Sequence, residues 1–148
     1  MRKIAIGCDP NAQAEKEAII KYIEAKGYGE VTDFGSDDPI YANVAISVAE
    51  AVAAGEYERG ILMCGTGLGV SIAANKVKGA IAAVCSDVYS AQRARLSNDA
   101  NILCMGAFTT GGKVRELLVD AFLTCEFVPG CGSQPKVDRY VEYDMNRK

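Results

Sequence analysis

Short apolar runs alternate five times with longer amphipathic stretches along this chain. The runs have the length of buried strands and are bounded by turn residues; they occupy residues 3–7, 30–34, 60–64, 80–84 and 101–105. Helical patterns follow the runs, within residues 11–26, 40–54, 70–76, 86–97 and 111–125. This order predicts a single-domain, Rossmann-like three-layer α/β sandwich, in which helices cover both faces of a five-stranded parallel sheet.

The unbroken alternation predicts one α/β domain over residues 1–128 and a C-terminal tail over residues 129–148. A chain of 148 residues is long enough to bury a substantial core in one domain. The tail begins with several proline and glycine residues and ends in mixed charges, so we expect irregular structure there. The tail has little core of its own, which would fit an arm that docks on a partner subunit.

The third predicted strand runs directly into a glycine-rich turn. Its sequence, Gly60-Ile-Leu-Met-Cys64, continues as Gly65-Thr-Gly-Leu-Gly69 before a helix begins at Val70. Glycines after a strand let the backbone approach a ligand, and the N–H groups that open a helix suit an anion or a developing oxyanion. The same field would favour the thiolate of Cys64. Such turns are also common in α/β proteins, and a cysteine that ends a buried strand is often an apolar filler, so spacing alone leaves both readings open.

The ligand crevice of an open parallel sheet lies outside the carboxyl ends of its strands. The predicted strands bring five segments to that edge, namely residues 8–9, 33–35, 64–69, 86–87 and 106–109. The glycine turn is one of them and therefore lies where a site is expected.

Composition narrows the chemistry. The chain has no histidine, which excludes Ser/His/Asp and Cys/His nucleophilic machinery and every histidine-ligated metal site. The six cysteines form no C-x-x-C pair, so we expect reduced thiols rather than a disulfide framework or a metal site. A net charge of −3 gives no sign of a nucleic-acid surface, and no apolar run approaches the length of a membrane span. We therefore expect a cytoplasmic protein.

Four motifs, in order along the chain, resemble the family of type B ribose-5-phosphate isomerases and galactose-6-phosphate isomerase subunits. They are Gly7-Cys-Asp9, residues 60–76, Tyr89-Ser-Ala-Gln92 and Asn98-Asp-Ala-Asn101. The resemblance implies an aldose–ketose isomerase that uses no metal or other cofactor and acts on a small sugar phosphate through a cis-enediolate. It also implies a homodimer or homotetramer with the site at the subunit boundary.

The resemblance assigns a role to each candidate residue. Cys64 would be the thiolate base that moves a proton between two neighbouring carbons, and Thr66 would handle hydroxyl protons. Backbone N–H groups of the turn would hold the enediolate oxygen, from Gly65, Gly67, Gly69, Val70 and Ser71. The remaining substrate-binding candidates are Asp9, Ser97, Asn98 and Lys136. Asp9 has a second reading as a helix cap, and Asn98 as the residue that closes the fourth helix.

Three positions depart from the family pattern, and all concern substrate handling. Pro10 stands where a histidine near the substrate is usual, Ser97 replaces the histidine that opens the sugar ring, and Phe108 replaces a phosphate-binding arginine. In the tail, Lys136 falls near one of the family's basic phosphate positions.

These departures support two hypotheses. A four-carbon sugar 4-phosphate never closes into a furanose ring and needs no ring-opening residue, so the chain is either a pentose 5-phosphate isomerase or, more sharply, a tetrulose 4-phosphate isomerase. Alternatively, it is a catalytically inactive or hetero-oligomeric subunit that binds a sugar or sugar phosphate.

Overall fold

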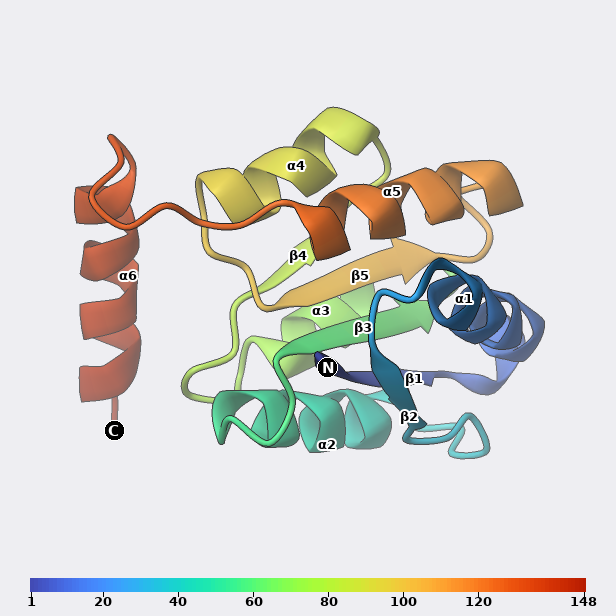
Figure 1. Ribbon diagram of the computed structural model, residues 1–148. Coiled ribbons are helices and arrows are strands. Elements are labelled where there is room, and N and C mark those ends of the chain that lie inside the picture. Colours follow the sequence, from blue (N-terminus) through green and yellow to red (C-terminus); the bar gives the residue numbers. More distant parts are fainter.

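The computed structural model describes residues 1–148 and contains one five-stranded sheet (Figure 1). All strand pairs are parallel, in the order β2-β1-β3-β5-β4. The strands are β1 (Lys3–Cys8), β2 (Glu30–Asp33), β3 (Arg59–Cys64), β4 (Ala82–Val84) and β5 (Ile102–Gly106). The helices are α1 (Gln13–Lys26), α2 (Tyr41–Ala53), α3 (Leu68–Ala74), α4 (Val88–Leu96), α5 (Gly112–Thr124) and α6 (Gln134–Asn146), and a 3-10 turn, η1 (Pro10–Ala12), precedes α1. The predicted fold class is confirmed.

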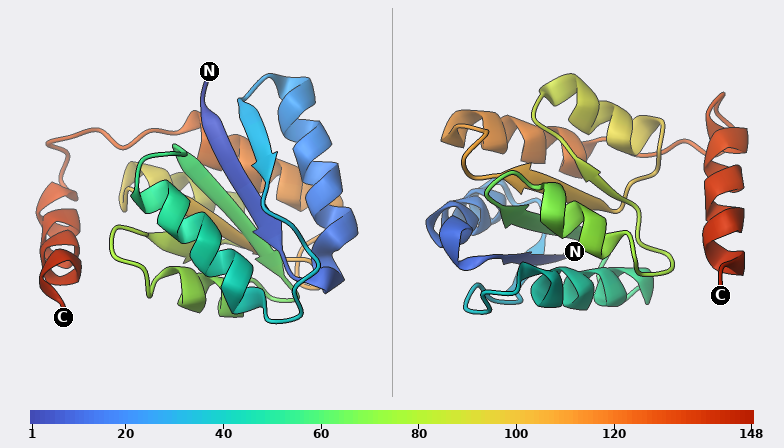
Figure 2. Two further views of the ribbon diagram at one scale, coloured as in Figure 1. Left: turned by 90° about the horizontal axis from the view of Figure 1, so that it is seen from below. Right: turned by 180° about the vertical axis from the view of Figure 1, so that it is seen from behind.

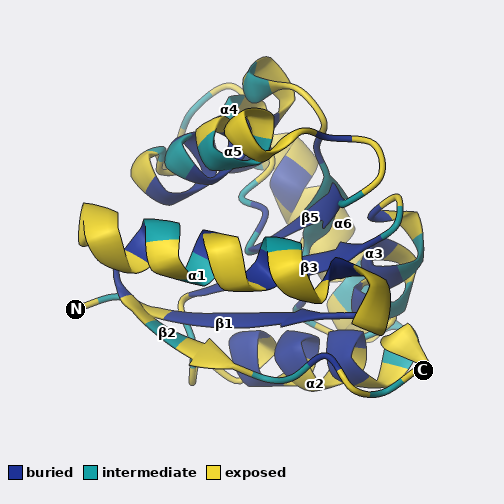
Figure 3. Ribbon diagram, turned by 90° about the vertical axis from the view of Figure 1, so that its right-hand side faces the viewer, coloured by how far each residue is buried: buried dark blue, intermediate teal, exposed yellow.

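Helices cover both faces of the sheet (Figure 2). Because successive side chains of a strand point to opposite faces, β3 contributes to two cores. Ile61 and Met63 pack with α1, α4 and α5 on one face. Leu62 and Cys64 pack with α2 and α3 on the other. Figure 3 shows the result, with β1 and β3 buried between helices whose inner faces are also buried.

Backbone hydrogen bonds tie together the loops at the carboxyl edge of the sheet. The N–H of Asp9 donates to the carbonyl oxygen of Met63 over 3.1 Å, which fixes the loop after β1 against β3. The N–H of Ala107 donates to the carbonyl oxygen of Cys64 over 2.8 Å, which does the same for the loop after β5. The end of β3 is therefore held from both sides.

The tail differs from the prediction, because residues 134–146 form α6 rather than irregular structure. Pro135 lies in the first turn of this helix, where a missing N–H costs nothing. This proline therefore begins a helix and does not interrupt one. Val137 is buried, and the Asp144 carboxylate accepts a hydrogen bond from the N–H of Gly79 over 2.8 Å. In Figure 1, α6 lies beyond the amino ends of β3 and β5. None of the helices combines the length and the apolar character that a membrane crossing needs.

Candidate active site

Cys64 ends β3 at the centre of the carboxyl edge, and the following turn folds around its sulfur. Its Sγ accepts a hydrogen bond from the N–H of Gly67 over 3.1 Å, and the residue is only 5% exposed. Gly67 has a φ of +79°, and a Cβ there would lie 2.9 Å from the backbone carbon of Met105. Only glycine therefore fits where the turn must bring an N–H to the sulfur.

The start of α3 leaves two backbone donors free. The N–H of Leu68 donates to the Thr66 hydroxyl oxygen over 3.2 Å. The N–H groups of Gly69 and Val70 have no acceptor within the chain, as expected for the first turn of a helix. Thr66 itself is exposed. Val70 is fully buried, so this part of the turn offers the N–H of Gly69 and the Thr66 hydroxyl to a ligand.

Ser71 supports the turn from behind. Its N–H is used within the helix, donating to the carbonyl oxygen of Gly67 over 3.3 Å. Ser71 is buried, with 9% of its surface exposed. Of the predicted cradle, Gly65 and Gly69 are the partly exposed members whose N–H groups have no acceptor within the chain. The N–H groups of Gly67 and Ser71 are already engaged, and Val70 is fully buried.

The other cysteines near this edge are packed thiols. Burial raises the pKa of Cys8 to about 12 and the pKa of Cys85 to about 11, and burial together with Cys64 raises the pKa of Cys104 as well. Each of the three would stay protonated near neutral pH. Cys64 differs from them in accepting a backbone N–H. All six cysteines are free, and no group of three or more acidic or thiol side chains is arranged to hold a metal ion.

Asp9 lies at the same edge, directly after β1. One carboxylate oxygen accepts a hydrogen bond from the N–H of Asn11 over 3.0 Å, so Asp9 caps η1. The residue is 8% exposed, and its other carboxylate oxygen has no hydrogen bond within the chain. The cap and the ligand readings of Asp9 are therefore compatible.

A partly buried ion pair beside this loop was not foreseen from the sequence. The Lys16 ammonium, in the first turn of α1, lies 2.8 Å from a carboxylate oxygen of Asp33, and its side chain is only 3% exposed. The same Asp33 oxygen accepts the N–H of Gly35. The pair joins the loops after β1 and β2, but a lysine within a helical pattern gives no sequence signal of this.

Two aromatic rings flank the turn and also escaped prediction. The Phe108 ring lies where a Cβ on Gly65 would be 2.9 Å from it, although 73% of Phe108 is exposed. The Tyr41 phenol lies where a Cβ on Gly69 would be 2.3 Å from its hydroxyl oxygen. The first and last glycines of the turn are thus in contact with aromatic side chains.

Three candidate residues do not join Cys64 within one chain. Ser97 and Asn98 follow α4, which starts at the carboxyl edge and returns to the amino edge before β5 begins (Figure 1). The five residues of β5 separate the two edges by about 16 Å of strand. Lys136 lies on α6, and the Tyr140 hydroxyl of that helix donates to the carbonyl oxygen of Asn98.

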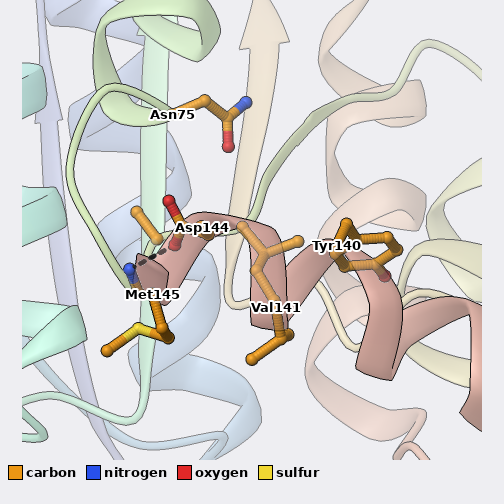
Figure 4. Close-up of a pocket in the computed structure, with 8 residues that line it drawn as sticks. Asn75, Tyr140, Val141, Asp144 and Met145 are labelled. Atoms are coloured by element: carbon orange, nitrogen blue, oxygen red, sulfur yellow. Dashed lines mark hydrogen bonds between the residues drawn. The ribbon is translucent and has the colours of Figure 1, made fainter. Parts of the chain in front are cut away.

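A cavity of about 240 Å³ lies beneath α6 at the amino edge (Figure 4). Its lining is largely apolar and consists of Asn75, Gly79, Ala80, Ile81, Tyr140, Val141, Asp144 and Met145. Its polar groups are already paired, since Asn75 bonds to both the N–H and the carbonyl of Ala82 and Asp144 bonds to Gly79. This cavity therefore lacks free polar groups and is separate from the Cys64 edge.

Known proteins match this chain along nearly its whole length. A family model described as Ribose/Galactose Isomerase matches residues 4–140. The D-erythrulose-4-phosphate isomerase of Pectobacterium atrosepticum is 45% identical over 152 residues, covering 100% of this chain and 99% of the relative. The ribose-5-phosphate isomerase B of Escherichia coli is 44% identical over 150 residues, covering 99% of each protein. The solved structure of Clostridium thermocellum ribose-5-phosphate isomerase B matches with a TM-score of 0.89 at 41% identity, covering 97% of each chain.

Proposed function

This chain belongs to the ribose/galactose isomerase family, and on that premise we propose that it interconverts the aldose and ketose forms of a small sugar phosphate through a cis-enediolate, with Cys64 as the base. The observation that carries the proposal is the position of the Cys64 sulfur, 3.1 Å from the Gly67 nitrogen in the turn that also contains the free N–H groups of Gly65 and Gly69.

The proposed proton transfer needs a base and a set of donors. The Cys64 thiolate removes a proton from the carbon beside the carbonyl, and the resulting thiol returns a proton to the neighbouring carbon. The free N–H groups of Gly65 and Gly69 face the oxygen on which negative charge develops, and one such donor is commonly worth about 3 kcal/mol of barrier. No step requires a metal ion.

Thr66 handles the hydroxyl protons in this proposal. Its oxygen already accepts the N–H of Leu68, so its own proton is left to donate to a substrate oxygen. Asp9 accepts hydrogen bonds from substrate hydroxyls with its unpaired carboxylate oxygen.

The substrate that we favour is a tetrulose 4-phosphate. The chain has no histidine to open a sugar ring, and a four-carbon sugar 4-phosphate forms no furanose because the required hydroxyl is esterified. A relative at 45% identity is named an erythrulose-4-phosphate isomerase, but a relative at 44% is named a ribose-5-phosphate isomerase. Since these identities are nearly equal, the ring argument and not the similarity decides our choice.

The complete site in this proposal includes a partner subunit. Ser97, Asn98 and Lys136 lie at the amino edge of their own chain, so they reach a Cys64 only in a second copy. We propose a homodimer or a homotetramer, with the tail of residues 129–148 docked on the partner. Mixing equal amounts of inactive Cys64→Ala and inactive Asn98→Ala should restore about a quarter of the wild-type activity after subunit exchange. About half of the dimers are then mixed, and each mixed dimer has one intact site of two. No recovery after subunit exchange, or a monomer in light scattering, would contradict this arrangement.

The reducing cytoplasm is the location that we propose. The support is chemical: the chain has six free cysteines and its substrate is a charged sugar phosphate. Cell fractionation with an antibody against the chain tests this placement.

The alternative function is a catalytically inactive or hetero-oligomeric subunit. Two observations favour it: Phe108 supplies no charge for phosphate, and Ser97 supplies no acid or base. Incubating the purified protein separately with erythrulose 4-phosphate and ribose 5-phosphate decides between the functions. We expect turnover of the tetrulose phosphate and its loss in Cys64→Ala. Turnover of the pentose alone would reject the tetrulose assignment, and no turnover, or an unchanged rate in Cys64→Ala, would favour the alternative.

A further inference from the structure

Tyr41 is packed against the turn that follows Cys64. A Cβ on Gly69 would lie 2.3 Å from both the Cζ atom and the hydroxyl oxygen of Tyr41, and 2.5 Å from Cε1. No side chain fits in that space unless the phenol moves. Gly69 has an ordinary negative φ, so its lack of a side chain serves this contact rather than the backbone conformation.

Two hydrogen bonds to Asp38 hold the segment in which α2 begins. Tyr41 is the first residue of α2, and Asp38 lies three residues before it. The two carboxylate oxygens of Asp38 accept hydrogen bonds from the N–H of Ile40 over 2.8 Å and from the side-chain amide of Asn43 over 2.9 Å. The phenol therefore extends from a fixed helix start to the start of α3.

The hydroxyl of Tyr41 has no partner within the chain. Tyr22, Tyr28 and Tyr140 each donate their hydroxyl to a protein oxygen. The Tyr41 hydroxyl makes no such bond, and the residue is 38% exposed. Its oxygen lies beside Gly69, whose own N–H is also free. Two unused polar groups thus share one space at the edge that carries Cys64.

We propose that the Tyr41 hydroxyl binds an oxygen atom of the sugar phosphate, as a substrate-binding residue of the site that contains Cys64. This inference rests on the proposed isomerase function and adds to it a side chain from α2. The phenol donates a hydrogen bond to the same substrate region that the N–H of Gly69 faces, so the two donors together fix the orientation of the bound chain.

The variant Tyr41→Phe tests this inference, because it removes only the hydroxyl. Losing a hydrogen bond to the substrate should lower kcat/KM about tenfold, mainly through a higher KM. Gly69→Ala should cause a loss of similar or greater size, since the new methyl group displaces the ring. The double variant should be little worse than the poorer single variant, because both changes remove the same contact.

The matched control is Tyr57→Phe, which removes another hydroxyl without a protein partner. Tyr57 packs against Phe34, with ring centroids 5.4 Å apart, and precedes β3 at the amino edge. It should keep the wild-type KM. An unchanged KM in Tyr41→Phe, with an active wild type, would overturn the inference alone, as would a lower Tm with no change in KM. A wild type inactive on both erythrulose 4-phosphate and ribose 5-phosphate would overturn the proposed function and this inference with it.

Discussion

Replacing Gly67 by alanine tests whether the fold of the turn sets the chemistry of Cys64. Gly67 has a φ of +79°, where an alanine costs about 1–2 kcal/mol. The new Cβ would also lie 2.9 Å from the Met105 backbone carbon and 3.2 Å from the Met105 nitrogen. Backbone atoms move far less readily than the end of a side chain, so overpacking adds about 1–3 kcal/mol.

Gly55 provides a control in which only the clash is missing. It has the same φ of +79°, but a Cβ there would meet nothing within 4 Å. Gly55→Ala should therefore show the backbone penalty alone and keep its isomerase activity. The difference in unfolding free energy between the two variants, measured in urea, isolates the clash with Met105. This difference should be about 1–3 kcal/mol. For a chain of this size, each kcal/mol should lower Tm by roughly 2–4 °C.

Gly67→Ala should also lose isomerase activity, beyond its loss of unfolding free energy. The shift that relieves the clash moves the Gly67 N–H away from the Cys64 sulfur, 3.1 Å away in the wild type. A displacement of this kind commonly costs more than tenfold in kcat/KM. Equal unfolding free energies for Gly67→Ala and Gly55→Ala, or full activity in Gly67→Ala, would refute the reasoning.

Two further predictions concern buried and surface ionisation. Asp33→Asn should destabilise the fold by about 2 kcal/mol in urea unfolding, because it leaves the buried Lys16 ammonium without its carboxylate; Asp33 is partly exposed, which keeps the loss below that of a fully buried pair. The hydrogen bonds to Asp120 raise the pKa values of Tyr22 and Tyr28 to about 12, above the ordinary value of 10. The stability that these hydrogen bonds contribute is complete below pH 10 and falls as the pH rises towards 12. Asp120→Asn should therefore lower the pKa values of both tyrosines, measured by ultraviolet absorbance, and reduce the loss of unfolding free energy between pH 10 and pH 12.

The sheet and the turn could be predicted because their signals are local. Each central strand is buried on both faces, so its sequence is an almost continuous apolar run, as in residues 60–64. The glycine turn also has a local sequence signal, since Gly67 needs a positive φ. The five-stranded parallel sheet and the family are confirmed by the topology and by the match over residues 4–140.

Contacts between distant segments could not be predicted. The Lys16–Asp33 pair and the packing of Tyr41 on Gly69 join residues from different helices and loops. No spacing in the sequence distinguishes Lys16 from a solvated helix lysine. The helix α6 was missed for another reason: its stripe of Val137, Tyr140 and Val141 is too short to stand out in a polar tail.

The placement of Asn98 could have been derived from the predicted order alone. In a parallel sheet, a helix that follows the carboxyl end of one strand must return to the amino edge before the next strand begins. Asn98 lies between the fourth helix and the fifth strand, so the amino edge is its only place in its own chain. Cys64 lies at the carboxyl edge for the same topological reason. A site that uses both residues therefore requires two copies of the chain, because the alternation of strands and helices already places Cys64, Thr66 and Asp9 at one edge of a single chain and Asn98 at the other.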